Sequence, residues 1–269
     1  MSQLLSNQLQ FSIPPDPETW PHRIEAACSV LESVFPGERL HLAASYSPSR
    51  QRVVLTERPK YLRAKLKTRT RWFNLSNGKA HVGCGDDVRD EGLLSLGGGG
   101  YSVSVLFPQC PYEVCEALIV ALGDALEAHF AQWSPWYTFL WLRHVQWGHW
   151  TSHGLELPSH SLPRLEYQDI ALAEEHPDIL GWLNYWSPRA CEHLGFAEAQ
   201  LDSRFKSCSY RTPAGAWLVK LGLEALDYRI AEHRQMLATA YEQFLLVGAR
   251  RVGLGGDQVP EDWCPSRGN

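Results

Sequence analysis

Residues 101–107 read YSVSVLF, and this short run decides the expected fold. Aromatic or branched residues stand at the odd positions, and serine or leucine stands at the even positions. A period of two puts successive side chains on opposite faces of a strand, so one face is expected to be buried and the other exposed to solvent. The segment therefore predicts a β-strand.

Three segments on either side of this strand have the apolar spacing of amphipathic helices. The first is expected to begin at Asp16 as the N-cap, with Pro17 in the first helical position, and to end at Gly37. The second covers 111–132 and the third covers about 227–247. In each segment apolar residues recur at intervals of three or four, which places them on one side of a helix.

Further strands are expected in neighbouring runs, without strict alternation with helices. These runs are LHLAASY, RVVLT, TRWFNLS, ILGWLNYWS, RFKSCSY and AWLVKL. The pair at 77–78, Asn-Gly, and the triplet at 213–215, Pro-Ala-Gly, have the composition of hairpin turns. This order favours an α+β fold with a mainly antiparallel sheet flanked by amphipathic helices.

The segment 152–163, SHGLELPSHSLP, is the expected linker between two parts of the chain. We expect an N-terminal half over 1–151, a C-terminal half over 164–250 and a loose tail over 253–269. At 269 residues the chain is long enough to bury a large core without a metal or disulfide.

The cysteine content and the N-terminal sequence indicate in which compartment the protein is expected. The seven cysteines are odd in number and contain no CxxC pair, which fits a reducing compartment better than a secreted disulfide framework. The first fifteen residues lack lysine, arginine and a long apolar core, so they do not predict a signal peptide. No apolar run approaches the ~20 residues of a membrane span. We therefore expect a cytoplasmic protein without a membrane partner.

The decapeptide HVQWGHWTSH, 144–153, raises the question of a metal or catalytic site. His149 and His153 are four residues apart, as in helical zinc-peptidase motifs, but Trp150 stands where those enzymes have their glutamate base. The sequence thus predicts no metal, no cofactor and no catalytic residues. A cytosolic hydrolase centred on Cys84, which lies near His81, or on His149 is left as an alternative.

Two charged segments suggest binding surfaces. Residues 50–72 hold nine lysines and arginines and one acid, Glu57, with Tyr61 and Trp72 interleaved, so a nucleic-acid-binding surface is a further alternative. The net charge of −5 argues against it, which makes nucleic acid an unfavoured partner. Residues 166–202 hold eight acids and one base, Arg189.

The acidic segment surrounds ILGWLNYWSPRACEHLGF, the most distinctive stretch of the chain. A strand here would place Trp182, Asn184 and Trp186 on one face. Two indoles flanking one amide are typical of a contact surface, because a buried asparagine must find hydrogen-bond partners. A core strand covered on both faces is the other interpretation.

The sequence GWLNYWS at 181–187 resembles the GW-aliphatic-x-Y-aromatic-S signature of the immunity protein 52 family. RLEYQDIALAEEHPDILG upstream, and TPAGAWLVKL and ATAYEQFLLVGAR downstream, follow in the order of that family. The resemblance implies an α+β antidote of bacterial polymorphic-toxin and type VI secretion systems, without catalysis. It implies a nuclease toxin of restriction-endonuclease fold as the usual partner, and it marks Gly181, Trp182, Tyr185 and Ser187 as signature positions.

From these features we expect an immunity protein that neutralises a cognate effector toxin by protein–protein contact. Aromatic anchors suit the centre of a tight interface, and carboxylates suit its rim when the partner has a cationic cleft. The expected contact residues are Trp147, Trp150, Trp182, Asn184, Tyr185 and Trp186 at the centre and Glu174, Glu175 and Asp178 at the rim.

Overall fold

The strand predicted from YSVSVLF is present in the computed structural model as β6 (Tyr101–Pro108). By its internal contacts the chain divides into two units, Met1–Ala131 and Gln132–Asn269, which are described separately below. The structure describes residues 6–14, 16, 18–35, 39–44, 52–66, 73–76, 80–85, 101–147, 158, 161–162, 177, 179–198 and 201–247.

The first unit contains an antiparallel sheet with the strand order β3-β2-β4-β5-β6-β1. Its pairing is widest between β1 and β6, where Leu9 lies opposite Val105 and Phe11 opposite Val103. Besides β6, the strands are β1 (Ser6–Ile13), β2 (Leu42–Ala44), β3 (Arg52–Val54), β4 (Phe73–Ser76) and β5 (His81–Gly85).

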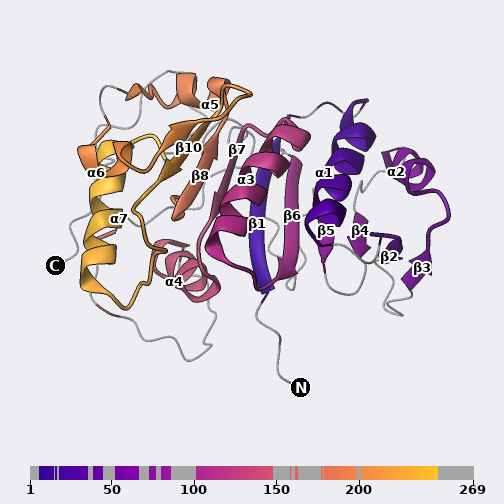
Figure 1. Cartoon of the computed structure of the whole chain (residues 1–269), viewed down its shortest axis with the longest axis horizontal. Helices are drawn as coiled ribbons and strands as arrows, with labels where there is room; N and C mark the ends of the chain where they lie inside the picture. Colours follow the sequence, from indigo (N-terminus) through magenta and orange to yellow (C-terminus); the bar gives the residue numbers. More distant parts are fainter. Residues whose placement is uncertain are drawn as a thin grey trace. The chain divides into compact units, whose positions relative to one another are not determined.

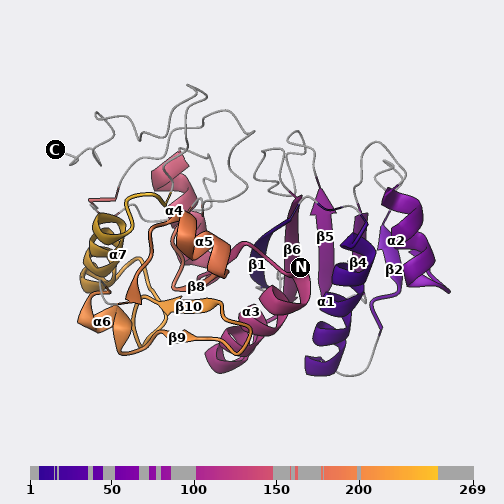
Figure 2. The same ribbon diagram turned by 90° about the horizontal axis from the view of Figure 1, so that it is seen from above.

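The alternation read from the sequence of β6 is confirmed by burial. Val103, Val105 and Phe107 are buried, whereas Ser104 and Leu106 are half-buried. The buried side chains of β6 belong to the same core as Leu9 and Phe11 from β1. Helices α1 (Trp20–Val34) and α3 (Tyr112–Leu126) lie side by side over one face of this sheet (Figures 1 and 2).

The first two helices differ from their predicted bounds for local reasons. Helix α1 begins three residues later than expected, because the Asp16 carboxylate accepts hydrogen bonds from the Glu18 amide and the Thr19 hydroxyl in a turn ahead of the helix. Helix α3 ends at Leu126 because Glu127 adopts a left-handed conformation with φ 50°. Residues that were expected to continue it form β7 (Phe130–Trp133), which crosses the boundary between the units.

The second unit contains a smaller antiparallel arrangement with the strand order β8-β10-β9. The strands are β8 (Leu183–Trp186), β9 (Tyr210–Arg211) and β10 (Trp217–Lys220). The predicted turn at 213–215 joins β9 to β10, which confirms that hairpin. The helices are α4 (Trp136–Trp147), α5 (Pro188–His193), α6 (Ser203–Lys206) and α7 (Ala231–Gln243) (Figure 1).

The expected strand RFKSCSY is wrong over its first half. Residues Ser203–Lys206 form α6, because the Asp202 side chain accepts a hydrogen bond from the Arg204 amide and caps the turn. The α+β class itself, with antiparallel strands flanked by helices, is confirmed. Most of the expected linker at 152–163, the turn at 77–78 and the tail at 253–269 lie outside the described residues. None of the helices that the structure describes is both long and apolar enough to cross a bilayer.

Candidate functional site

The four predicted contact residues of β8 and its approach lie in the interior of the second unit. Trp182 is 2% exposed, Tyr185 is 4% exposed, and Asn184 and Trp186 are fully buried. A side chain buried in the free protein is not available to anchor a partner, so the predicted aromatic surface is wrong for these residues. The alternative interpretation, a core strand covered on both faces, is confirmed.

Gly181 allows two stretches of backbone to meet. A Cβ at this position would lie 2.5 Å from the carbonyl oxygen of Trp133, at a distance that real side chains do not adopt. The next residue, Trp182, is fixed by two hydrogen bonds. The Trp182 amide donates to the Ser134 hydroxyl at 2.9 Å, and the Trp182 indole N–H donates to the Gly222 carbonyl at 3.0 Å. The glycine and tryptophan of the signature therefore have structural roles.

The buried amide of Asn184 has its partners inside the protein. Its Oδ1 accepts from the Gly181 amide at 2.9 Å, and its Nδ2 donates to the carbonyls of Gly181 at 2.9 Å and Val219 at 3.2 Å. These bonds close the turn before β8 and tie it to β10. The asparagine thus has the hydrogen-bond partners that a buried polar side chain requires.

The aromatic residues of the signature belong to a cluster of ring contacts. Trp186 meets Phe244 edge-on, with ring centroids 4.9 Å apart, and meets Phe196 in the same manner at 5.5 Å. Trp182 packs against Trp133 at 5.6 Å. Edge-to-face and tilted contacts at these distances stabilise a core beyond the area that they bury. The high tryptophan content of this region is, in the described part, a packing feature.

The signature ends in a helix cap. The Ser187 hydroxyl accepts from the Ala190 amide at 3.1 Å and begins α5, with Pro188 in its first turn. A serine cap followed by proline in the first turn is a common way to start a helix.

A second set of hydrogen bonds joins α7 to α4 and to the segment before β8. The Tyr241 hydroxyl of α7 accepts from the Leu180 amide and donates to Gln146 of α4. All of these contacts hold the second unit together.

The other predicted residues are not tested by the structure. Trp147 lies at the end of α4 and Cys84 lies in β5, but their side chains are not among those described. Outside the described residues lie Trp150, Glu174, Glu175, Asp178 and His149. Among the residues that are described, no group of three or more His, Cys, Asp or Glu side chains is placed to hold a metal ion.

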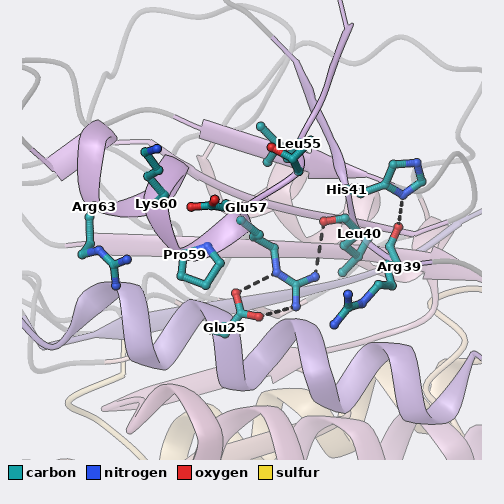
Figure 3. Close-up of a pocket in the computed structure, with 11 residues that line it drawn as sticks. Glu25, Arg39, Leu40, His41, Leu55, Glu57, Pro59, Lys60 and Arg63 are labelled. Carbon is teal, nitrogen blue, oxygen red and sulfur yellow. Dashed lines mark hydrogen bonds and ion pairs between the residues drawn. The ribbon is translucent and has the colours of Figure 1, made fainter.

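A cavity in the first unit offers a different candidate site. It has a volume of about 350 Å³ and lies where α2 (Arg58–Leu66) begins, between that helix, Glu25 of α1 and the chain entering β2 (Figure 3). We call it the cationic pocket. Its charged lining is Glu25, Arg39, Glu57, Arg58, Lys60 and Arg63.

Arg58 forms the floor of the cationic pocket. Its side chain is 9% exposed, and its guanidinium donates to both oxygens of Glu25, at 2.7 and 2.6 Å, and also to Glu32 and to the Leu40 carbonyl. Burial alone would lower the pKa of Arg58, but the hydrogen bonds from the two carboxylates raise it above its ordinary value. Arg58 therefore stays charged and fixes α2 to α1.

Glu32 completes this network behind the pocket. Burial raises the pKa of its carboxyl, but the hydrogen bonds from Arg58 and from the Leu40 amide outweigh it, so the pKa lies below its ordinary value. Arg39 adds a further favourable charge. The carboxylate is thus held in its ionised form beside α2 and the chain entering β2.

Sequence reasoning missed this site because α2 was read as part of a basic run. Its residues, RPKYLRAKL, have too few apolar positions to show a helical stripe. One available signal was Pro59 in the first turn, where proline is favoured in helices. Tyr61 is half-buried and Leu62 is buried, and two neighbouring positions are not enough to reveal a helical period.

The architecture and contacts define an α+β protein of two units with a densely packed signature segment. The chain belongs to the DUF5953 family, a domain of unknown function, whose sequence model matches residues 21–252. Comparison with curated proteins gave no match.

A solved structure titled "Pseudomonas aeruginosa T6SS protein PA0821" is similar in fold. The similarity has a TM-score of 0.54 and 13% sequence identity, and it covers 94% of this chain and 77% of that one. At this identity the likeness describes the fold alone.

Proposed function

We propose that this protein is an immunity protein of a type VI secretion system, which binds a cognate toxin and blocks it. The observation that carries the proposal is the likeness in fold, over 94% of the chain, to a protein named for that system. The order of the segments that resemble the immunity protein 52 family supports the finer assignment. Neutralisation by contact requires no catalytic residue or cofactor in this chain, and a nuclease partner would place the pair in the cytoplasm.

The toxin-binding surface in this proposal is the acidic segment 166–202, without the buried aromatic residues. Of its acids, Glu192 and Glu198 are exposed, and Glu174, Glu175 and Asp178 belong to the same segment. A nuclease has a cationic cleft for its substrate, and carboxylates directed at such a cleft increase the association rate and disfavour wrong partners. The partner is therefore recognised by charge around its substrate cleft.

Co-expression with the product of the adjacent gene tests the main proposal. We expect rescue of growth from the toxin and co-purification of the two proteins at a fixed ratio. A toxin that kills equally well in the presence of this protein, with no complex formed, would overturn the proposal. The assay uses the full chain, so it does not depend on either unit folding alone.

Charge reversal tests the acidic surface separately. The double variant Glu192→Lys/Glu198→Lys should slow association with the toxin about tenfold at low salt, and the effect should shrink as salt screens the charges. The matched control is Glu224→Lys/Glu232→Lys, which makes the same charge change at exposed acids outside the segment. Equal association rates for the two double variants would rule out the acidic segment as the steering surface.

A further inference from the structure

The cationic pocket contains positive charge that has no ion-pair partner among the residues that the structure describes. Lys60 and Arg63 are three residues apart on α2, and in the described part of the chain neither forms an ion pair. Figure 3 shows them along α2 on one side of the pocket, with Arg39 and His41 on the other. Arg39, Lys60 and Arg63 are all exposed. Cations from two separate segments thus surround one hollow.

The floor of the pocket is already neutralised. Arg58 is shared between Glu25 and Glu32, and Arg39 lies close enough to Glu32 to lower the pKa of its carboxyl. These groups balance one another and stay in place without a ligand. A floor held this way is pre-organised, so little ordering is required when a ligand enters.

Among the charged residues that line the pocket, Glu57 is the one carboxylate that remains to balance the positive charges of Lys60 and Arg63. Glu57 is exposed and lies at the start of α2 in the same pocket. The unbalanced charge is therefore positive, and the ligand that compensates it is an anion. Because Glu57 would repel that anion, its removal should strengthen binding, whereas loss of Lys60 and Arg63 should weaken it.

The dimensions of the pocket favour an organic anion over a bare inorganic one. Its volume of about 350 Å³ is within the usual range for small-molecule sites and is about ten times the share of one water. Leu55 and Pro59 contribute a non-polar wall beside the charged groups. An inorganic anion would fill a small part of this space and leave that wall uncovered.

We propose that the cationic pocket binds a small organic anion whose negative charge is carried on oxygen, as in a phosphate ester or a polycarboxylate. The proposal does not rest on toxin binding, because none of the pocket residues belongs to the acidic segment 166–202. It adds a small-molecule site to a protein proposed to act by protein–protein contact.

The test uses the full-length protein at low ionic strength, titrated calorimetrically with ADP, citrate and inorganic pyrophosphate. We expect ADP or citrate to bind with a dissociation constant below 1 mM, on the order of the weak end of ligand affinities, and pyrophosphate to bind more weakly. The stronger of the two organic probes shows whether the ligand is phosphate or carboxylate.

Variants with opposite expected effects assign the binding to this pocket. Lys60→Gln/Arg63→Gln should weaken binding about tenfold, and Glu57→Gln should strengthen it a few-fold, as expected for exposed charge pairs. Lys206→Gln, an exposed lysine in the second unit, is the matched control and should change nothing. All of these side chains are exposed, so the variants are expected to fold.

Three results would overturn the proposal. The first is no binding of either organic probe at 10 mM, about ten times the expected limit. The second is binding that Lys60→Gln/Arg63→Gln leaves unchanged. The third is a single-stranded oligonucleotide that binds more tightly than ADP and depends on the same lysine and arginine, which would make this region a nucleic-acid surface.

Discussion

The absence of a side chain at Gly181 decides how closely two segments of the second unit can approach. The Trp133 backbone occupies the position where a Cβ would stand, with its oxygen 2.5 Å and its carbonyl carbon 2.9 Å away. Both neighbours are backbone atoms, which do not move aside as the end of a flexible side chain does. The glycine of the signature is thus required by packing.

Gly181→Ala should reduce the free energy of unfolding by about 2 kcal/mol or more, because an added methyl must displace backbone. The control is Gly195→Ala, where φ is +59° and nothing lies within 4 Å, so only conformational strain of about 1 kcal/mol is expected. Urea denaturation of both variants measures the difference. A Gly181→Ala protein as stable as Gly195→Ala would contradict the packing argument.

Trp182 and Trp186 were expected to anchor a toxin, and their burial changes what their substitution would report. Trp186→Ala should cost about 3–5 kcal/mol of folding free energy, because it opens a cavity among Phe196 and Phe244. Tyr137→Ala, at a side chain that is 50% exposed, should stay within about 0.5 kcal/mol of the wild type. Thermal denaturation compares them, and equal melting temperatures would refute the core assignment.

The expected loss of folding free energy also affects any binding experiment on Trp182 and Trp186. A Trp186→Ala protein that no longer binds a toxin would be reporting partial unfolding, not loss of a contact. Binding should be measured only for variants whose folded fraction has been determined. Variants of exposed residues such as Glu192 and Glu198 avoid this difficulty.

Among the helices, the join between α1 and α2 depends on one buried cation and two carboxylates. Glu32 has a pKa below its ordinary value of 4.5 in the folded protein. A carboxyl of this kind stabilises the fold above its unfolded pKa, and the contribution is lost as the pH falls through the lower, folded value. The α1–α2 contact should therefore weaken in acid.

Glu32→Gln should cost about 1 kcal/mol at pH 7, because the glutamine keeps an acceptor oxygen but loses the charge that pairs with Arg58. As the pH falls through the ordinary value of 4.5 and then through the lowered pKa, the wild type should lose this advantage, so that the two proteins approach equal stability. Urea denaturation at several pH values checks it. Glu242→Gln, an exposed acid of α7, is the control, and a constant gap across this range for Glu32→Gln would exclude the charge pairing.

How well each element could be predicted depended on how regular its apolar spacing was. Tyr101–Pro108 and Tyr112–Leu126 follow clean periods of two and of three to four, and both were predicted apart from their ends. Strand β1 was missed although Leu9, Phe11 and Ile13 alternate with polar residues, so its signal was available. Helix α2 was missed because charged side chains are interspersed with its apolar ones, and its position is fixed by the distant carboxylates of Glu25 and Glu32.

At the scale of the whole molecule, the α+β class followed from the order of the predicted elements, but the candidate site did not. The signature at 181–187 was correctly singled out, yet whether its indoles face inward depends on partners such as Trp133, Phe196 and Phe244. Trp133 and Phe244 are far from β8 in the sequence, and Phe196 is separated from β8 by α5. A period-two pattern gives the face of a side chain, but not what covers that face.

The cationic pocket could not be predicted from local sequence patterns either. Arg39, Arg58 and Lys60 come from segments that local patterns treat as loop or charge run. The pairing of β2 with β3, together with the ion pairs from Arg58 to Glu25 and Glu32, brings them to one place. Sites assembled from short strands and a polar helix carry little local signal.

The pairing of β1 with β6 has a consequence for synthesis of the chain on the ribosome. Asn7 and Pro108 are 101 residues apart, yet they meet in the sheet. At translation rates of about 5–20 residues per second, the first strand would wait about 5–20 s for its neighbour to emerge. During that interval Leu9, Phe11 and Ile13 have no sheet to cover them, so the nascent β1 segment is expected to bind a chaperone.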